Sequence, residues 1–160
     1  MRIALLCLAL TLPSAADIGP ALFRHHYIAR EMPGANRGLG SSVLADFDKD
    51  GDLDFAVANR GDGKIYWFEF RGADEWARHT IGDVPTGQLA GLGIDADTDG
   101  WLDVVVGGVW FRNPGAPQGK AWPRFTYDSR VKTEIHDMVA ADIDGDAKQD
   151  IVVLGDREGC

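Results

Sequence analysis

Clustered basic residues and helical periodicity are both lacking in this sequence of 160 residues. Lys and Arg number 16 against 25 Asp and Glu, which gives a formal net charge of -9 at pH 7. Because phosphate binding requires clustered Lys and Arg, nucleic acid is not an expected partner. No segment keeps a helical period for more than about two turns, so the pattern does not predict an α-helical domain.

Long apolar runs are also lacking, since no stretch approaches the length of about 20 residues that spans a bilayer. The apolar run at residues 3–12 follows a basic start and precedes the small residues 14–16, which is typical of an export signal. A buried helix is the alternative interpretation. We expect cleavage after residue 16 and a secreted or periplasmic protein without a membrane span. Cleavage removes Cys7 and leaves Cys160, so no disulfide is expected within the mature chain.

What the sequence does contain is an internal repeat of three acidic clusters. The clusters are DFDKDGDLD at residues 46–54, DADTDGWLD at 95–103 and DIDGDAKQD at 142–150. Their first aspartates stand 49 residues apart (46 to 95) and 47 residues apart (95 to 142). Self-similarity at this period is typical of repeat proteins and propellers.

Short β-rich runs precede and follow each cluster, which predicts a strand-loop-strand hairpin around it. Aromatic segments repeat between the clusters: Tyr-Trp-Phe at 66–68 matches Val-Trp-Phe at 109–111, and residues 76–81 match 122–127. One repeat therefore offers about four strands separated by Gly, Pro and Asn turns, which is the pattern of a propeller blade. We expect an all-β fold of four-stranded antiparallel blades, about three of them, with repeats at residues 22–70, 71–113 and 114–160. Trp67 and Trp110 are expected to pack between neighbouring blades, with a ligand-facing role as the alternative.

The acidic clusters have the chemistry of calcium sites, because Ca²⁺ takes six to eight oxygen ligands and closely spaced carboxylates on a tight loop supply them. In each cluster, positions 1, 3 and 5 are expected to point inward, position 9 to add a fourth carboxylate, and position 7 to add a backbone carbonyl. The candidate metal-binding residues at these positions are Asp46, Asp48, Asp50, Asp52 and Asp54; Asp95, Asp97, Asp99, Trp101 and Asp103; and Asp142, Asp144, Asp146, Lys148 and Asp150.

Three alternatives to these calcium loops can be weighed on the residues. An EF-hand requires flanking helices and a glutamate at position 12, which here is Val57, Val106 and Val153. Magnesium fits less well, because it demands octahedral geometry and retains its waters. The third interpretation is that the aspartates are solvated turn residues without a metal. In the last cluster, Ala147 stands at position 6 where Gly is expected, which predicts a weaker or distorted third site.

The repeated D-x-D-x-D-G-x-x-D loop resembles that of the FG-GAP or VCBS repeat proteins, which include the integrin α-chain propellers. The resemblance covers residues 22–160, and the third loop departs from it at Ala147. It implies calcium held between the first and second strands of a blade in a seven-bladed propeller. The mature residues 17–160 would then be a partial propeller, completed by further sequence or by self-assembly.

Two functions follow from these expectations. The first is a binding or adhesion module whose loop-bearing faces take a protein or carbohydrate ligand, favoured by the lack of Gly-x-Ser-x-Gly and His-Glu-x-x-His motifs. The second is a fragment of a carbohydrate-active propeller, of the polysaccharide lyase or sugar dehydratase type. His136 is the candidate base for such chemistry, with Arg37 and Gln88 at comparable places in the earlier repeats. A hydrogen-bonded residue at a strand start is the structural alternative for His136.

Overall fold

A computed structural model describes residues 24–32, 38–84, 88–131 and 134–155. The expected export signal at residues 1–16 and the candidate Arg37 lie outside the described residues. All ten elements of the described chain are strands: β1 (Leu39–Ala45), β2 (Asp54–Asn59), β3 (Lys64–Gly72), β4 (Glu75–Asp83), β5 (Gly91–Ile94), β6 (Asp103–Val106), β7 (Val109–Phe111), β8 (Arg124–Thr126), β9 (Ile135–Ala141) and β10 (Asp150–Gly155).

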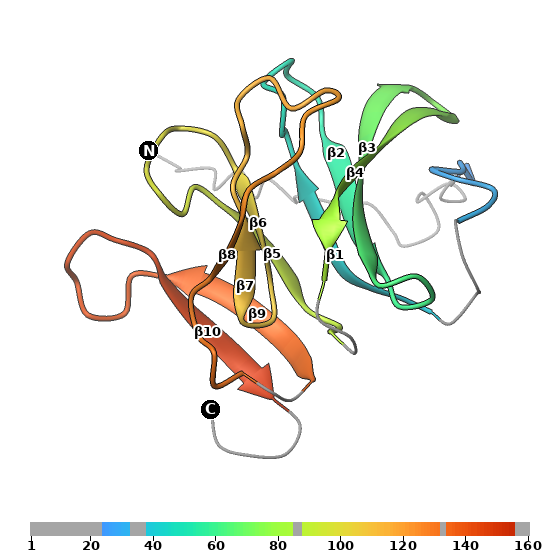
Figure 1. Cartoon of the computed structure of the whole chain (residues 1–160). Helices are drawn as coiled ribbons and strands as arrows, with labels where there is room; N and C mark the ends of the chain where they lie inside the picture. The colour runs from blue at the N-terminus through green and yellow to red at the C-terminus, as the bar shows by residue number, and fades with distance from the viewer. Residues whose placement is uncertain (1–23, 33–37, 85–87, 132–133, 156–160) are drawn as a thin grey trace, which may run out of the picture.

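The strands form three antiparallel sheets in chain order (Figure 1). We call β1–β2–β3–β4 sheet 1, β5–β6–β7–β8 sheet 2, and the pair β9–β10 hairpin 3. The prediction of an all-β fold with four-stranded antiparallel blades is confirmed. Among the described residues the sheets do not close into a ring. Sheets 1 and 2 each run across a repeat bound chosen from the sequence, because β4 follows residue 70 and completes sheet 1, and β8 follows residue 113 and completes sheet 2.

The sheets approach one another through their first strands. The Ser41 amide of β1 donates to the Leu89 carbonyl, and the Leu89 and Ala90 amides donate to the Ile135 carbonyl at the start of β9. Gly91 makes the contact between β1 and β5 possible, since a Cβ there would lie 2.7 Å from the Ser41 carbonyl oxygen. This arrangement of sheets around their first strands is that of successive propeller blades.

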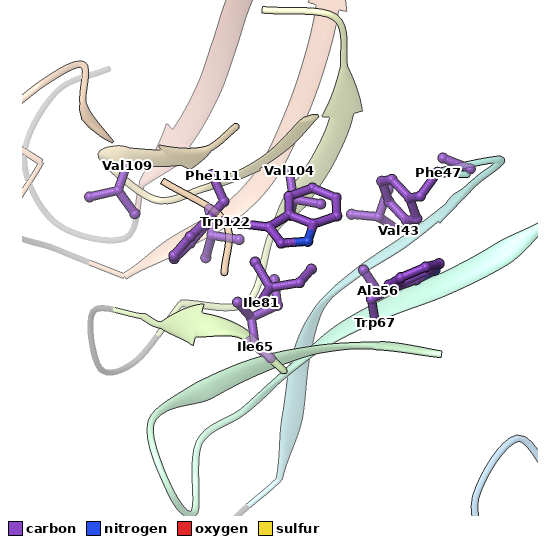
Figure 2. Packing of buried hydrophobic residues seen from close by; sticks show 13 residues of the cluster. Val43, Phe47, Ala56, Ile65, Trp67, Ile81, Val104, Val109, Phe111 and Trp122 are labelled. Carbon is purple, nitrogen blue, oxygen red and sulfur yellow. The ribbon is translucent and has the colours of Figure 1, made fainter. Parts of the chain in front are cut away.

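The main hydrophobic core lies between sheet 1 and sheet 2 rather than within either sheet. Trp122, from the segment before β8, sits among side chains of both sheets (Figure 2). Its ring meets Phe47 edge-on at a centroid distance of 5.8 Å and lies 6.5 Å from the Trp67 ring. Such edge-to-face geometry is the preferred arrangement of aromatic pairs. The prediction that Trp67 packs between neighbouring sheets is confirmed.

A second, smaller core covers the opposite face of sheet 1. Val57, Tyr66 and Phe68 are buried there, and Ile28 and Met32 from the segment before β1 pack against them. Asp74 fastens this segment by accepting hydrogen bonds from the Tyr27 amide and pairing with His26. Sheet 1 is therefore covered on both faces.

Candidate metal sites

The three acidic clusters connect the first and second strands of the three sheets, as the sequence predicts. We call residues 46–54 loop 1, 95–103 loop 2 and 142–150 loop 3. In each loop the carboxylate at position 1 accepts hydrogen bonds from the amides at positions 5 and 6, which folds the loop around that side chain. These bonds join Asp46 to Asp50 and Gly51 at 3.2 Å each, Asp95 to Asp99 at 3.0 Å and Gly100 at 2.9 Å, and Asp142 to Asp146 at 3.1 Å and Ala147 at 3.0 Å.

Positions 4 and 6 of every loop adopt the left-handed backbone conformation. In loop 1 the φ angles are 61° at Lys49 and 100° at Gly51, whereas in loop 3 they are 81° at Gly145 and 68° at Ala147. Loop 3 thus follows the same path with its glycine moved to position 4. Holding a residue with a Cβ in this region costs about 1–2 kcal/mol, so loop 3 carries backbone strain at position 6.

The carboxylates at positions 1, 3 and 5 converge in all three loops. Within each set, one carboxylate oxygen from every residue lies within 4.8 Å of the others; the sets are Asp46, Asp48 and Asp50; Asp95, Asp97 and Asp99; and Asp142, Asp144 and Asp146. Three carboxylates this close repel one another unless a cation lies between them. An all-oxygen donor set of this kind fits a hard cation such as Ca²⁺.

Position 9 is placed differently from the sequence expectation of a fourth converging carboxylate. Asp54 accepts hydrogen bonds from the Phe47 amide at 3.1 Å and the Phe70 amide at 2.9 Å, and Asp103 likewise accepts from Ala96 at 3.0 Å and Asn113 at 2.7 Å. Both aspartates are fully buried, and burial raises the pKa of each to about 6 against the opposing effect of these amides. Position 9 thus ties loop 1 to β3 and loop 2 to the segment just after β7. In loop 3, Asp150 accepts from the Ile143 amide at 3.0 Å.

Position 7 differs in each loop. In loop 1, burial and then the neighbouring Asp50 raise the pKa of Asp52, whose Oδ1 is buried without a hydrogen-bond partner. In loop 2, Trp101 lies under the Lys49 ammonium at 4.2 Å from the ring centroid. In loop 3, Lys148 pairs with Asp146 at 3.0 Å. The unpartnered oxygen of Asp52 adds a donor to the oxygen-rich surroundings of loop 1, which supports the fit to a hard cation.

The segment after β7 contacts both loop 1 and loop 2, and these contacts were not predicted from the sequence. Arg112 pairs with Asp97 and Asp99 of loop 2, while Gln118 Nε2 donates to Asp48 of loop 1 at 2.6 Å. Buried Asn113 donates to the Phe47 carbonyl at 2.8 Å and the Leu102 carbonyl at 3.1 Å. Arg112 could have been noticed as a charge that follows the repeated Trp-Phe pair. The Gln118 contact spans 70 residues and leaves no local signal.

The candidate catalytic residues do not form a recognisable constellation in the described part of the chain. His136 is exposed on β9, whereas Gln88 is buried and its Oε1 accepts a hydrogen bond from the Ile135 amide at 3.1 Å. A cavity of about 260 Å³ lies beside β7 and β8, and neither residue lines it. Gln88 therefore links the segment before β5 to the backbone of β9 through this hydrogen bond.

Fold and loops together define a repeat protein of stacked antiparallel sheets, each four-stranded unit carrying one acidic loop between its first and second strands. The FG-GAP-like repeat model matches residues 46–106 and 95–153, so the chain belongs to the FG-GAP-like repeat family. The two matches begin at Asp46 and Asp95, the first residues of loops 1 and 2. No curated protein and no solved structure matches the chain. None of the described residues forms a helix long and apolar enough to cross a membrane.

Proposed function

We propose that this chain is an exported calcium-binding repeat module in which loops 1, 2 and 3 each hold one Ca²⁺. The observation that carries the proposal is the convergence of three carboxylates within 4.8 Å in each loop, repeated with the same backbone hydrogen bonds. The ion would offset their mutual repulsion and hold each hairpin in shape. The all-oxygen donor sets suit Ca²⁺, which takes irregular oxygen coordination, better than Mg²⁺, which demands near-ideal octahedral geometry.

The FG-GAP-like repeats make the chain a repeat module suited to binding. We propose that a protein or carbohydrate partner binds at the loop-bearing ends of the sheets, because all three loops connect equivalent strands and so emerge at equivalent ends. Calcium would act there by fixing loop conformation. A partner of this kind binds more weakly after chelation, which solid-phase binding with and without chelator measures.

The decisive experiment is a calorimetric calcium titration of the exported, chelator-treated protein, with its melting temperature followed in parallel. Mass spectrometry of the same sample tests cleavage after residue 16. We expect up to three sites and a rise in melting temperature, since each site adds about 2.7 kcal/mol of stability at 100 times its Kd. Absence of both heat and thermal shift in a folded sample contradicts the calcium proposal.

Single substitutions assign the sites. Asp48→Asn, Asp97→Asn and Asp144→Asn each remove one converging carboxylate charge from one loop, so each is expected to remove or weaken one site and leave the others. Asp83→Asn is the matched control, because it makes the same charge change on β4 outside the loops, at a side chain paired with Lys64. Unchanged stoichiometry and affinity in all three loop variants would place the ions elsewhere.

A further inference from the structure

Loop 2 is already paired with a cation from elsewhere in the chain. Arg112 Nε lies 2.6 Å from Asp97 Oδ2, and Arg112 Nη2 lies 2.9 Å from Asp99 Oδ2. Two of the three converging carboxylates of loop 2 are therefore joined by one guanidinium. Such charge-assisted bonds from a planar fork are among the stronger hydrogen bonds in proteins, and they neutralise part of the charge that attracts a metal ion.

At the position of sheet 1 that corresponds to Arg112, the side chain is negatively charged. Asp54 accepts the amide of Phe70 and Asp103 accepts the amide of Asn113, so the preceding residues, Glu69 and Arg112, are equivalent in the two sheets. Glu69 pairs with His79 and Arg71, and it still lies close enough to loop 1 to repel the carboxylates of Asp48 and Asp52. The repeat thus substitutes a carboxylate for a guanidinium beside otherwise similar loops.

The other neighbours increase this difference. Loop 1 receives a neutral donor, because the Gln118 amide hydrogen-bonds to Asp48 without adding charge. Lys49, the one lysine within loop 1, places its ammonium over the Trp101 ring of loop 2. Loop 1 therefore keeps its negative charge, whereas loop 2 has two basic side chains beside it.

We propose that Arg112 is a tethered counter-cation of loop 2 that calcium must displace, so that loop 1 fills at lower calcium concentration than loop 2. The inference rests on the calcium binding proposed above. Arg112 is 44% exposed, so its guanidinium can turn into solvent when the ion enters. In the absence of calcium the same residue screens Asp97 and Asp99 and holds loop 2 in its folded form, which makes sheet 2 less dependent on metal than sheet 1.

The test is Arg112→Gln, titrated with Ca²⁺ by calorimetry in a full-length Asp48→Asn/Asp144→Asn background that leaves loop 2 as the intact site. Removing two exposed ion pairs is expected to raise the calcium affinity of loop 2 about three- to tenfold. Without calcium, the melting temperature is expected to fall. Arg112→Lys keeps the charge without the fork and is expected to give an intermediate affinity. Arg130→Gln is the matched control, because Arg130 makes a similar exposed pair with Asp128 away from the loops.

Each outcome is decisive for the inference. An affinity of loop 2 that is unchanged or lower in Arg112→Gln, with calcium binding intact in the unsubstituted protein, overturns the tethered cation and leaves the calcium proposal standing. An equal gain in Arg130→Gln also overturns it, because the effect is then one of net charge. Absence of calcium binding in the unsubstituted protein overturns the proposed function, and the inference with it.

Discussion

Sheet 1 and sheet 2 carry an aromatic pair at the same position, yet only one pair is buried. Trp67 stacks on His79 with ring centroids 4.5 Å apart, and Trp110 stacks on Phe125 at 4.8 Å. Trp67 is fully buried because Trp122, from the segment before β8, packs against it, whereas Trp110 is half-buried and its partner Phe125 is 45% exposed. The burial of a residue in this fold is therefore set by the neighbouring sheet more than by its own strand.

The largest expected effect on stability comes from replacing the two equivalent tryptophans, which tests this comparison directly. Trp67→Ala removes a fully buried ring from the core between the sheets and is expected to cost about 3–5 kcal/mol of unfolding free energy. Trp110→Ala removes a half-buried ring and is expected to cost about 1–2 kcal/mol. Denaturant unfolding of both variants measures the difference. Similar losses would show that the core between the sheets does not dominate stability.

Much of the fold could be predicted from the sequence because its signals are local. The aspartates at positions 1, 3 and 5 lie within five residues of one another, so their convergence follows from a tight turn alone. The strand runs on either side of each loop gave the hairpins for the same reason. The prediction that Trp67 packs between the sheets needed only the repeat, whereas Trp110 in the equivalent strand of sheet 2 is half-buried and lies outside the core between sheets 1 and 2.

What the sequence could not show is how one repeat meets the next. Arg112 and Gln118 contact loops 2 and 1 through a segment whose path depends on the packing of whole sheets. The role of position 9 was also hidden, because an aspartate that binds backbone amides and one that binds an ion occupy the same place in the motif. Asp54 and Asp103 separate from the converging three only once β3 and β7 are in position.

An effect of intermediate size is expected in the pH dependence of stability, measured with and without metal, because of the buried aspartates at position 9. Burial raises the pKa of Asp54 and Asp103 from 3.8 to about 6, so the folded protein binds more protons than the unfolded chain between these values. In chelator, their contribution to stability is therefore largest at low pH and is lost as pH rises from about 4 to 6.

With calcium present, the sign is expected to reverse. Protons compete with the ion for the loop carboxylates, so the stability that calcium adds is expected to rise with pH. Melting temperatures at several pH values, in chelator and in calcium, measure both slopes. If melting temperature changed with pH in the same way in chelator and in calcium, the result would contradict an ion held by these loops.

The smallest expected effect compares loop 3 with loop 1 at position 6. Ala147 is held at a φ of 68°, so Ala147→Gly relieves strain and is expected to stabilise hairpin 3 by about 0.5–1 kcal/mol, after the greater flexibility of glycine in the unfolded chain is subtracted. Gly51→Ala is the reverse change in loop 1, where an added Cβ meets no atom within 4 Å and backbone strain alone remains. It is expected to destabilise loop 1 by at least as much. Thermal unfolding of both variants measures the two shifts, and shifts of the same sign would mean that position 6 does not set the strain of these loops.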